Sequence, residues 1–389
     1  MKRLLALFLT LVILLTGLAA VASAQESEGF HWRDGKPYYI NSDGSILKGW
    51  KEIIESVEYE GVIYSWSYWI YGKADGYLVY NDWLQTGSQW RYFSGYSMVA
   101  GDTYEINGEY HLFDEDGVWC ISTREPGWIK KGDSWYCAKK RVYEWDGETF
   151  TEIYFCLDGP WQVDDVYYYF DKTGKCQTKA GWARYEWKDS VGIAHSDWYY
   201  VTNGGPLATG WKHIEGHWFY FTDWGYMVND CFRWIGEEGK EKLYAFAMTG
   251  VMYTNKWYHY DWYDDDNEIH TVWAYLGEDG AAKTGWFKVG SKWYYSGESG
   301  WLWMDCSVTD SQGNVYWLGK DGDMLYGWQQ VYGIDWSYFK GSGAMARQEW
   351  LQYGGKWYYF DENGLMVHGC TITINGTEYT FDANGACVV

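Results

Sequence analysis

Aromatic residues alternate with other side chains at a period of two in many short segments of the chain. The clearest segments are Trp357-Tyr358-Tyr359-Phe360 and Trp218-Phe219-Tyr220-Phe221. The tryptophan and the residue two positions later should share one face of a strand, because successive side chains of a strand point to opposite faces. An Asp-x-x-Gly sequence such as 361–364 then predicts a turn, since glycine takes positive φ at little cost. Each segment therefore predicts a β-hairpin.

This pattern of an aromatic strand segment followed by a turn repeats along the chain. Gly327-Trp328 and Glu349-Trp350 start two successive units 22 residues apart. The pattern runs from about residue 34 to the end and leaves no room for another kind of domain. A single hairpin of this length is marginal in water, whereas stacked hairpins bury their aromatic faces on one another. The sequence predicts an all-β solenoid of stacked β-hairpin repeats, with further units starting near Trp50, Trp83, Trp128, Trp182, Trp211 and Trp286.

Some units are longer than the rest. Residues 136–155 predict a longer hairpin that turns at Asp146-Gly147, and residues 256–275 predict another that turns near 264–268. Residues 51–82 and 183–197 are expected to be irregular. None of these stretches is long enough to hold a catalytic domain.

The amino terminus predicts export. Lys2 and Arg3 precede an apolar run from Leu4 to Leu18, and Ala22-Ser23-Ala24 has the small-x-small pattern of a signal-peptidase site. We expect residues 1–24 to be a signal peptide and residues 25–389 to be the repeat array. An uncleaved membrane anchor is the alternative. After cleavage no second apolar run could span a membrane, so attachment to a surface would depend on the folded protein.

Charge and composition narrow the choice of partners. The net charge of −22 opposes nucleic acid and anionic lipid, which bind clustered Lys and Arg, and it suits a cationic ligand or a neutral sugar. Aromatic residues make up 22 % of the chain, with 47 Gly and only 4 Pro, which favours short strands and tight turns over a disordered linker.

The eight cysteines predict disulfides if the chain reaches an oxidising compartment. A two-residue turn at Asp146-Gly147 would place Cys137 opposite Cys156 in the same hairpin, within reach of a bond. Free buried thiols are the alternative. No CxxC spacing occurs, so no zinc site is expected.

Other candidate chemistry is weak. His213 and His217 have no helix to give their spacing a meaning, so solvated loop histidines are expected. The run Asp264-Asp265-Asp266-Asn267-Glu268 lacks the glycine and spacing of a calcium loop, which favours a solvated hairpin tip. No nucleophile elbow, phosphate loop or zinc-hydrolase motif occurs. The sequence predicts no enzyme, no cofactor and no metal site.

The series Gly-Trp, Trp-Tyr-Tyr-Phe, Asp-x-x-Gly and Gly-x-Met resembles the cell-wall-binding repeats of choline-binding and glucan-binding proteins. The resemblance implies a left-handed superhelix with ligands held between successive repeats. Each ligand cage would combine the Gly-Trp tryptophan, the first tryptophan of Trp-x-Tyr and an aromatic residue of the next repeat. This pattern implies three complete cages: Trp182, Trp198 and Tyr220; Trp286, Trp293 and Trp317; and Trp328, Trp336 and Tyr359.

Elsewhere the same matching predicts incomplete cages. Trp211 and Trp218 would be followed by Ala245, and Trp83 and Trp90 by Leu112. Trp350 and Trp357 would be followed by Thr380, in a final unit, about 369–389, that is expected to be a cap. Most remaining aromatic residues are expected to form the core.

These observations lead to a functional hypothesis with two alternatives. The first is a secreted, non-catalytic protein associated with a Gram-positive type of cell wall through choline, teichoic acid or glycan. The second is a structural or host-adhesion surface protein whose repeats bind no small ligand. The third is a wall-targeted enzyme with a cryptic site in residues 51–82, which the lack of a concave scaffold disfavours.

Overall fold

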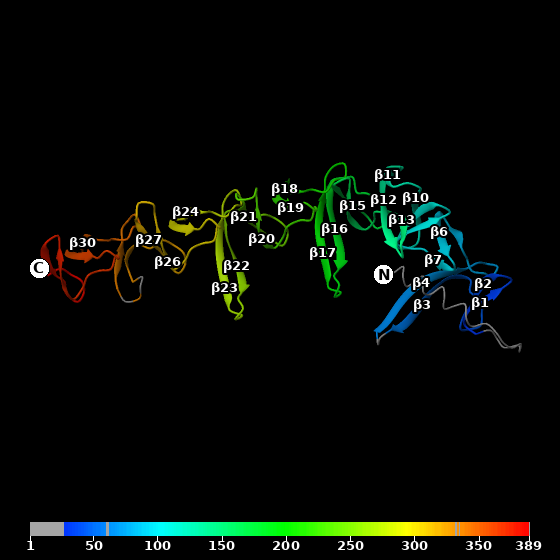
Figure 1. The fold of residues 1–389 in the computed structure, drawn as a ribbon, viewed down its shortest axis with the longest axis horizontal. Coiled ribbons are helices and arrows are strands. Elements are labelled where there is room, and N and C mark those ends of the chain that lie inside the picture. The colour runs from blue at the N-terminus through cyan, green and yellow to red at the C-terminus, as the bar shows by residue number, and fades with distance from the viewer. Residues whose placement is uncertain (1–26, 60–61, 331–332, 334, 389) are drawn as a thin grey trace. The chain divides into compact units, whose positions relative to one another are not determined.

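The structure is a computed structural model that describes residues 27–59, 62–330, 333 and 335–388. The expected signal peptide, residues 1–24, lies outside the described residues. The described residues form 33 strands and no helix, and each sheet has two or three strands. None of these residues therefore belongs to a helix that could cross a membrane. The prediction of an all-β fold built of hairpins is confirmed (Figure 1).

The chain divides into two units, the first ending at Leu207 and the second beginning at Ala208. Strands of the first unit pair antiparallel with their neighbours in sequence. These strands are β1 (Gly29–Arg33), β2 (Lys36–Ile40), β3 (Gly49–Tyr59), β4 (Val62–Gly72), β5 (Asp82–Thr86), β6 (Gln89–Ser94), β7 (Ser97–Met98), β8 (Thr103–Ile106), β9 (Glu109–Phe113), β10 (Trp119–Thr123), β11 (Gly127–Lys131), β12 (Ser134–Trp145), β13 (Glu148–Phe155), β14 (Gly159–Val163), β15 (Val166–Phe170), β16 (Gly181–Lys188) and β17 (Ala194–Val201).

In the second unit each sheet is a single hairpin. Its strands are β18 (Gly210–Ile214), β19 (His217–Phe221), β20 (Cys231–Ile235), β21 (Lys242–Phe246), β22 (Lys256–Tyr263), β23 (Ile269–Leu276), β24 (Gly285–Val289), β25 (Lys292–Ser296), β26 (Cys306–Thr309), β27 (Val315–Leu318), β28 (Gly327–Gln329), β29 (Ser337–Phe339), β30 (Glu349–Tyr353), β31 (Lys356–Phe360), β32 (Thr371–Ile374) and β33 (Thr377–Thr380).

One backbone hydrogen bond recurs between successive hairpins. After the turn at 361–364, the N–H of Met366 donates to the carbonyl of Trp336 in the preceding hairpin, 2.7 Å away. The N–H of Cys387 donates to the carbonyl of Trp357 in the same way, at 2.8 Å. Each turn is thus joined to the hairpin before it, and the hairpins within a unit stack as predicted.

The methionine of each Gly-x-Met packs under the next turn. Gly364 has a φ of +80°, and a Cβ there would lie 2.4 Å from the Sδ atom of Met345. Gly385 has the same relation to Met366. The turn therefore needs glycine both for its backbone conformation and for the close approach of the preceding methionine.

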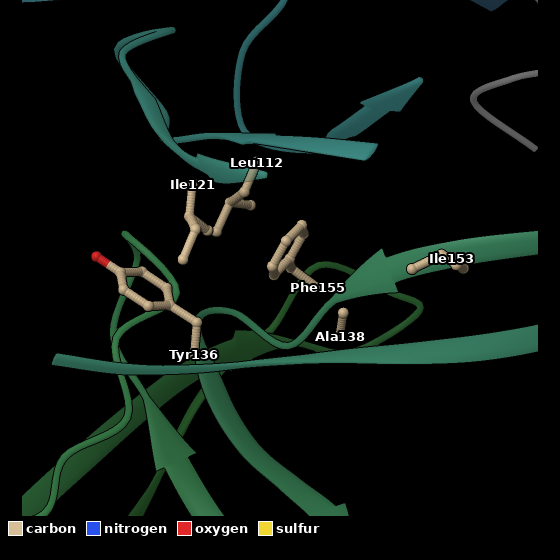
Figure 2. Close-up of a cluster of buried hydrophobic side chains, with 6 residues drawn as sticks. All are labelled: Leu112, Ile121, Tyr136, Ala138, Ile153 and Phe155. Atoms are coloured by element: carbon tan, nitrogen blue, oxygen red, sulfur yellow. The ribbon is translucent and has the colours of Figure 1, made fainter. Parts of the chain in front are cut away.

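Small aromatic and aliphatic clusters between hairpins take the place of one central core. A fully buried phenylalanine or aliphatic residue ends most hairpins, and Phe360 packs with Ala346 and Met366 in one such cluster. The cluster at the base of β12 and β13 is shown in Figure 2, where Leu112 and Ile121 point toward Tyr136 and Phe155 of the next hairpin. Stacking therefore buries apolar surface step by step, as expected of a repeat protein.

Four hairpins are longer than the rest. The predicted turn at Asp146-Gly147 is confirmed, because Trp145 pairs with Glu148 in the β12–β13 hairpin. The predicted hairpin over 256–275 is confirmed as β22 and β23. The expectation of irregular structure at 51–82 and 183–197 is wrong where β3–β4 and β16–β17 form long regular hairpins, whereas residues 73–81 lie outside the strands as expected. Polar residues on both faces of these exposed arms weaken the alternating pattern that would have revealed them.

Candidate functional site

The Gly-Trp tryptophan of each unit is the centre of an aromatic cluster. In the last complete unit, Trp350 on β30 pairs directly with Tyr359 on β31. The ring of Trp350 lies 5.1 Å from that of Tyr359 and 6.4 Å from that of Trp357. Trp357 and Tyr359 therefore share one face of the strand, as the two-residue period predicted.

The other face of the same strand points to the preceding hairpin. The ring of Tyr358 lies 5.1 Å from Trp328, and the ring of Phe360 lies 5.6 Å from it. The prediction that Tyr359 completes the cage of Trp328 and Trp336 is thus wrong, and Tyr358 takes that place. A shift of one residue along a strand moves a side chain to the opposite face, which explains the error.

The same shift affects the cage predicted at Trp286. Its ring lies 5.1 Å from that of Tyr316, whereas Trp317 is buried against Phe339 and Met345. Trp317 is therefore a core residue and the prediction that it lines the cage is wrong. Trp293 is 38 % exposed and shares a strand face with Tyr295, which pairs with Trp286.

The third predicted cage combines residues of both units. Trp182 and Trp198 of the first unit lie 6.3 Å apart, with their rings nearly perpendicular. Tyr220 of the second unit lies 5.2 Å from Trp211 of its own hairpin. Tyr220 thus holds the position that Tyr359 holds at Trp350, and the grouping with Trp182 stays a prediction.

Three cages that were expected to lack an aromatic residue have one. Tyr244 lies 4.8 Å from Trp211, and Tyr379 lies 4.8 Å from Trp350. His111 lies 5.3 Å from Trp83, and burial lowers the pKa of His111, so its ring is neutral at neutral pH. In each case the residue directly before the predicted one fills the place. The alternation of the strand, counted from the Trp-x-Tyr tryptophan, would have identified them.

Two further clusters were not predicted as sites. Trp128 lies 6.4 Å from Trp135 and 4.9 Å from Tyr168 of the next hairpin. Trp257 has no preceding glycine, yet its ring lies 4.9 Å from that of Tyr294. The contact between a hairpin tryptophan and the next hairpin is therefore more general than the Gly-Trp motif.

The site at Trp350 is open to solvent. Trp350, Trp357 and Tyr379 line a cavity of about 600 Å³ together with Cys387 and Val388. The rings of Trp350 and Trp357 meet at 84°, and 48 % of the Trp357 side chain is exposed. A compact cation in such a corner could contact more than one ring face, and a sugar could stack its C–H surface on one of them.

The site at Trp50 is built differently. Trp50 lies 6.4 Å from Trp69, but Arg91 stands where the other clusters have an aromatic residue. The Arg91 guanidinium lies 5.4 Å from the ring centre of Trp50. It is held there by hydrogen bonds that it donates to Thr86 Oγ1 at 2.8 Å and to the carbonyl of Asp116 at 3.2 Å. A cation of the protein thus occupies this aromatic corner.

The predicted disulfide pair is correctly placed in register. The N–H of Cys156 donates to the carbonyl of Cys137 at 2.9 Å, so the two residues face each other across the hairpin. Both are buried free thiols in the structure, in one cluster with Cys176. Burial raises the pKa of Cys176 to about 12, which keeps it protonated.

We expect Cys137 and Cys156 to be joined in protein recovered from an oxidising medium, because they lie opposite each other in a hydrogen-bonded pair. Peptide mass mapping without reduction should find the two cysteines in one cross-linked peptide pair that separates on reduction. Alkylation of Cys137 in unreduced protein would contradict the expectation.

The acidic tip of the β22–β23 hairpin brings three polar side chains together. The ligand atoms of Asp264, Glu268 and His270 lie within 4.8 Å of one another, and Asp264 Oδ2 is 2.6 Å from His270 Nε2. The β16–β17 tip has the same pair, Asp189 and His195, at 2.9 Å, without the third carboxylate. The aspartate–histidine contact therefore recurs as part of the turn, and the expectation of a solvated hairpin tip without a metal site stays a prediction.

Two models of known repeat families match parts of the chain. Residues 352–389 match the choline-binding repeat. Residues 209–227 and 284–300 match the cell wall binding repeat. The first match contains Trp357 and Tyr379, two of the three rings at the open cavity.

The curated relatives are much longer proteins. Glucosyltransferase-S of Streptococcus mutans is 24 % identical over 282 residues, which are 67 % of this chain and 15 % of the relative. Glucosyltransferase-I of Streptococcus downei is 27 % identical over 178 residues, 40 % of this chain and 10 % of the relative. The chain thus spans well under a fifth of the length of these relatives.

Solved structures of similar proteins also exist. Choline binding protein F from Streptococcus pneumoniae is 23 % identical and covers 86 % of this chain and 99 % of its own, with a TM-score of 0.43. CbpJ from the same species is 24 % identical and covers 79 % of this chain and 94 % of its own, with a TM-score of 0.35.

The repeat grammar, the stacked hairpins and the family matches agree with one another. The matched segments lie in the second unit, and the remaining hairpins of both units follow the same pattern of strand, turn and aromatic cluster. The chain therefore contains cell-wall-binding repeats at residues 209–227 and 284–300 and a choline-binding-type repeat at residues 352–389.

Proposed function

We propose that this chain is a secreted, non-catalytic protein that binds bacterial cell walls through the aromatic sites between its hairpins. The observation that carries this proposal is the open cavity lined by Trp350, Trp357 and Tyr379, two of whose rings, Trp357 and Tyr379, lie within the residues that match the choline-binding repeat. Export is inferred from the amino-terminal sequence, and binding without catalysis from the repeats, which extend over the whole of residues 34–389.

The preferred ligand is a choline-like quaternary ammonium, such as the choline of teichoic acid. Each aromatic face contributes about 0.5–2 kcal/mol to holding such a cation. The net charge of −22 favours cations over anions. A wall glycan is the second candidate ligand, because pyranose rings stack on the same tryptophan faces. No cofactor is required for either.

Several weak sites on one stack would act together. In the second unit, Trp211, Trp286, Trp328 and Trp350 each contact an aromatic residue of the following hairpin. A polymer that carries repeated choline or sugar groups can engage more than one of these sites at once, and its avidity then exceeds the affinity of any single site.

The direct experiment is retention of the full chain on immobilised choline and on purified wall glycan. The proposal predicts retention on choline and release by free choline. Failure to bind both supports would overturn the ligand assignment and favour a structural or host-adhesion role. Hydrolysis of peptidoglycan or glucan by the purified chain would overturn the non-catalytic assignment.

The guanidinium of Arg91 over the ring of Trp50 leads to a further prediction. Arg91→Tyr should add a choline site at Trp50, because it removes the guanidinium and restores the aromatic residue found at the other clusters. Isothermal titration of the full chain should then show one more bound choline per molecule. Unchanged stoichiometry in a folded variant would show that Trp50 and Trp69 serve packing alone.

A further inference from the structure

A cleft of about 790 Å³ lies away from the Gly-Trp clusters, between the β8–β9 hairpin and the long β12–β13 hairpin of the first unit. The neighbouring Gly-Trp residues, Trp83 and Trp128, are not among its lining residues. One of its lining residues, Ile153, belongs to the buried cluster of Figure 2, in which Phe155 lies beside Leu112. Toward the tip of the β12–β13 hairpin, residues 148–151 of β13 are exposed.

One wall carries a pair of stacked rings. Tyr143 and Phe150 are direct partners across the hairpin, with ring centres 5.7 Å apart and planes inclined by 21°. Their side chains are 42 % and 39 % exposed. Cross-strand pairs of this kind stabilise a hairpin, so the rings are held in place before any ligand arrives.

Arg141 already supplies a cation to this wall. Its guanidinium lies 5.6 Å from the ring centre of Tyr143 and 5.7 Å from that of Tyr154. It also forms an ion pair with Glu152 at 2.7 Å. Because a guanidinium already lies over the Tyr143 ring, this ring is less available to an external cation, and we expect the cleft to take an uncharged ligand rather than a choline-like one.

The opposite wall supplies donors and acceptors. Tyr104, Glu105 and Tyr110 come from the β8–β9 hairpin. Burial raises the pKa of Tyr110, and so do the carboxylate of Glu105, to which its hydroxyl hydrogen-bonds, and that of Glu152; the hydroxyl therefore remains protonated, and its oxygen can still accept a hydrogen bond. The carboxylates of Glu105 and Glu152 can accept hydrogen bonds and would repel an acidic glycan.

The edge of β13 adds backbone groups. This strand is the outer strand of the sheet β11–β12–β13, and the N–H of Phe155 points away from β12 and donates to Thr103 Oγ1 at 3.0 Å. Backbone groups alternate along an antiparallel strand, so those of Ile153 and Thr151 point the same way. Both residues line the cleft.

We propose that this cleft is a second binding site, for an uncharged oligosaccharide of hexopyranose units. The Tyr143–Phe150 pair would stack against the C–H face of a sugar ring, while the carboxylates, the Tyr110 hydroxyl and the edge of β13 bond its hydroxyl groups. An extended peptide could pair with the edge of β13, but carboxylates and tyrosine hydroxyls on both sides fit a ligand with many hydroxyl groups better. This site deepens the glycan part of the proposed function and does not depend on choline binding.

The test is calorimetric titration of the full chain with maltohexaose, isomaltohexaose and N-acetylated chitohexaose. At least one should bind, and Phe150→Ala should weaken that binding about tenfold or more, because it removes half of the stacked pair. Phe150→Tyr, which keeps the ring, should bind within about threefold of the natural chain. The matched control is Trp145→Ala, which removes a ring that is 58 % exposed on the same hairpin but does not line the cleft, and should leave the affinity unchanged.

The results separate this site from the choline sites. Retention on choline should be the same for Phe150→Ala and the natural chain, and saturating choline should not displace the oligosaccharide. The site would be overturned if no oligosaccharide binds, if Trp145→Ala weakens binding as much as Phe150→Ala, or if choline competes. Choline retention without oligosaccharide binding would overturn this site and leave the proposed function intact. Binding of an extended peptide such as pentaalanine that Phe150→Ala abolishes, without oligosaccharide binding, would assign the cleft to peptides instead.

Discussion

Phe360→Ala is expected to lower the free energy of unfolding of the second unit by about 3–5 kcal/mol, the usual range for removing a buried phenylalanine ring. The Phe360 side chain is fully buried, and it packs with Ala346 and Met366 and lies 5.6 Å from Trp328. Its loss leaves a cavity between two hairpins whose stacking provides the stability. Urea unfolding followed by tryptophan fluorescence and circular dichroism measures the change.

Trp357→Ala is the matched control for this prediction. Trp357 lies on the same strand as Phe360 but on its opposite face, and 48 % of its side chain is exposed. We expect its loss to cost no more than about 1–2 kcal/mol, because only part of the ring leaves water on folding. If Trp357→Ala destabilised the chain more than Phe360→Ala, the division of the strand into a core face and a ligand face would be wrong.

The second large expected effect is a loss of choline affinity. Trp357→Ala should weaken choline binding at the Trp350 cavity by about two- to thirtyfold, because one aromatic face contributes about 0.5–2 kcal/mol. The variant should remain folded, as argued above. Calorimetric titration with choline should therefore show one site whose affinity is lower by this factor.

Trp224→Ala is the control for binding. Trp224 is a tryptophan of the same unit with 63 % of its side chain exposed, and it lies in a turn beside Tyr226 rather than in a cluster between hairpins. The number of bound cholines should be unchanged in this variant. Equal loss in Trp224→Ala and Trp357→Ala would mean that exposed tryptophan, not the corner at Trp350, accounts for binding.

The general fold could be predicted from the sequence because three local signals agree. Period-two aromatic segments such as 357–360 predict strands, Asp-x-x-Gly predicts the turn, and the recurrence of both predicts stacking. The register of the β12–β13 hairpin also followed from the turn at Asp146-Gly147, and it placed Cys137 opposite Cys156. These features depend on residues close together in sequence.

The composition of the aromatic sites depends on contacts between hairpins, and here the prediction was partly wrong. Matching one repeat to the next placed Tyr359 and Trp317 in cages, whereas Tyr358 and Tyr316 face the preceding hairpin. Because side chains alternate along a strand, an error of one position changes a ligand-facing residue into a residue of another interface. The same correction completes the sites at Trp211 and Trp350, which had been expected to lack an aromatic residue.

The long hairpins show a second limit of sequence analysis. Residues 51–59 and 62–72 were expected to be irregular because both faces carry polar residues, yet they pair as β3 and β4. An exposed hairpin has no buried face to impose a clear apolar period. Arg91 is a second residue whose role the sequence did not reveal. The sequence shows an arginine at this position, but not that its guanidinium lies over the ring of Trp50.

The proposed function requires that choline binds in the aromatic corners between successive hairpins. The most direct measurement compares retention on immobilised choline of the natural chain and of a variant with Trp218→Ala, Trp336→Ala and Trp357→Ala, which removes an exposed ring from three sites of the second unit. The natural chain should be retained and released by free choline, while the folded variant should elute much earlier. Equal retention of the two proteins, or no retention of the natural chain, would contradict it.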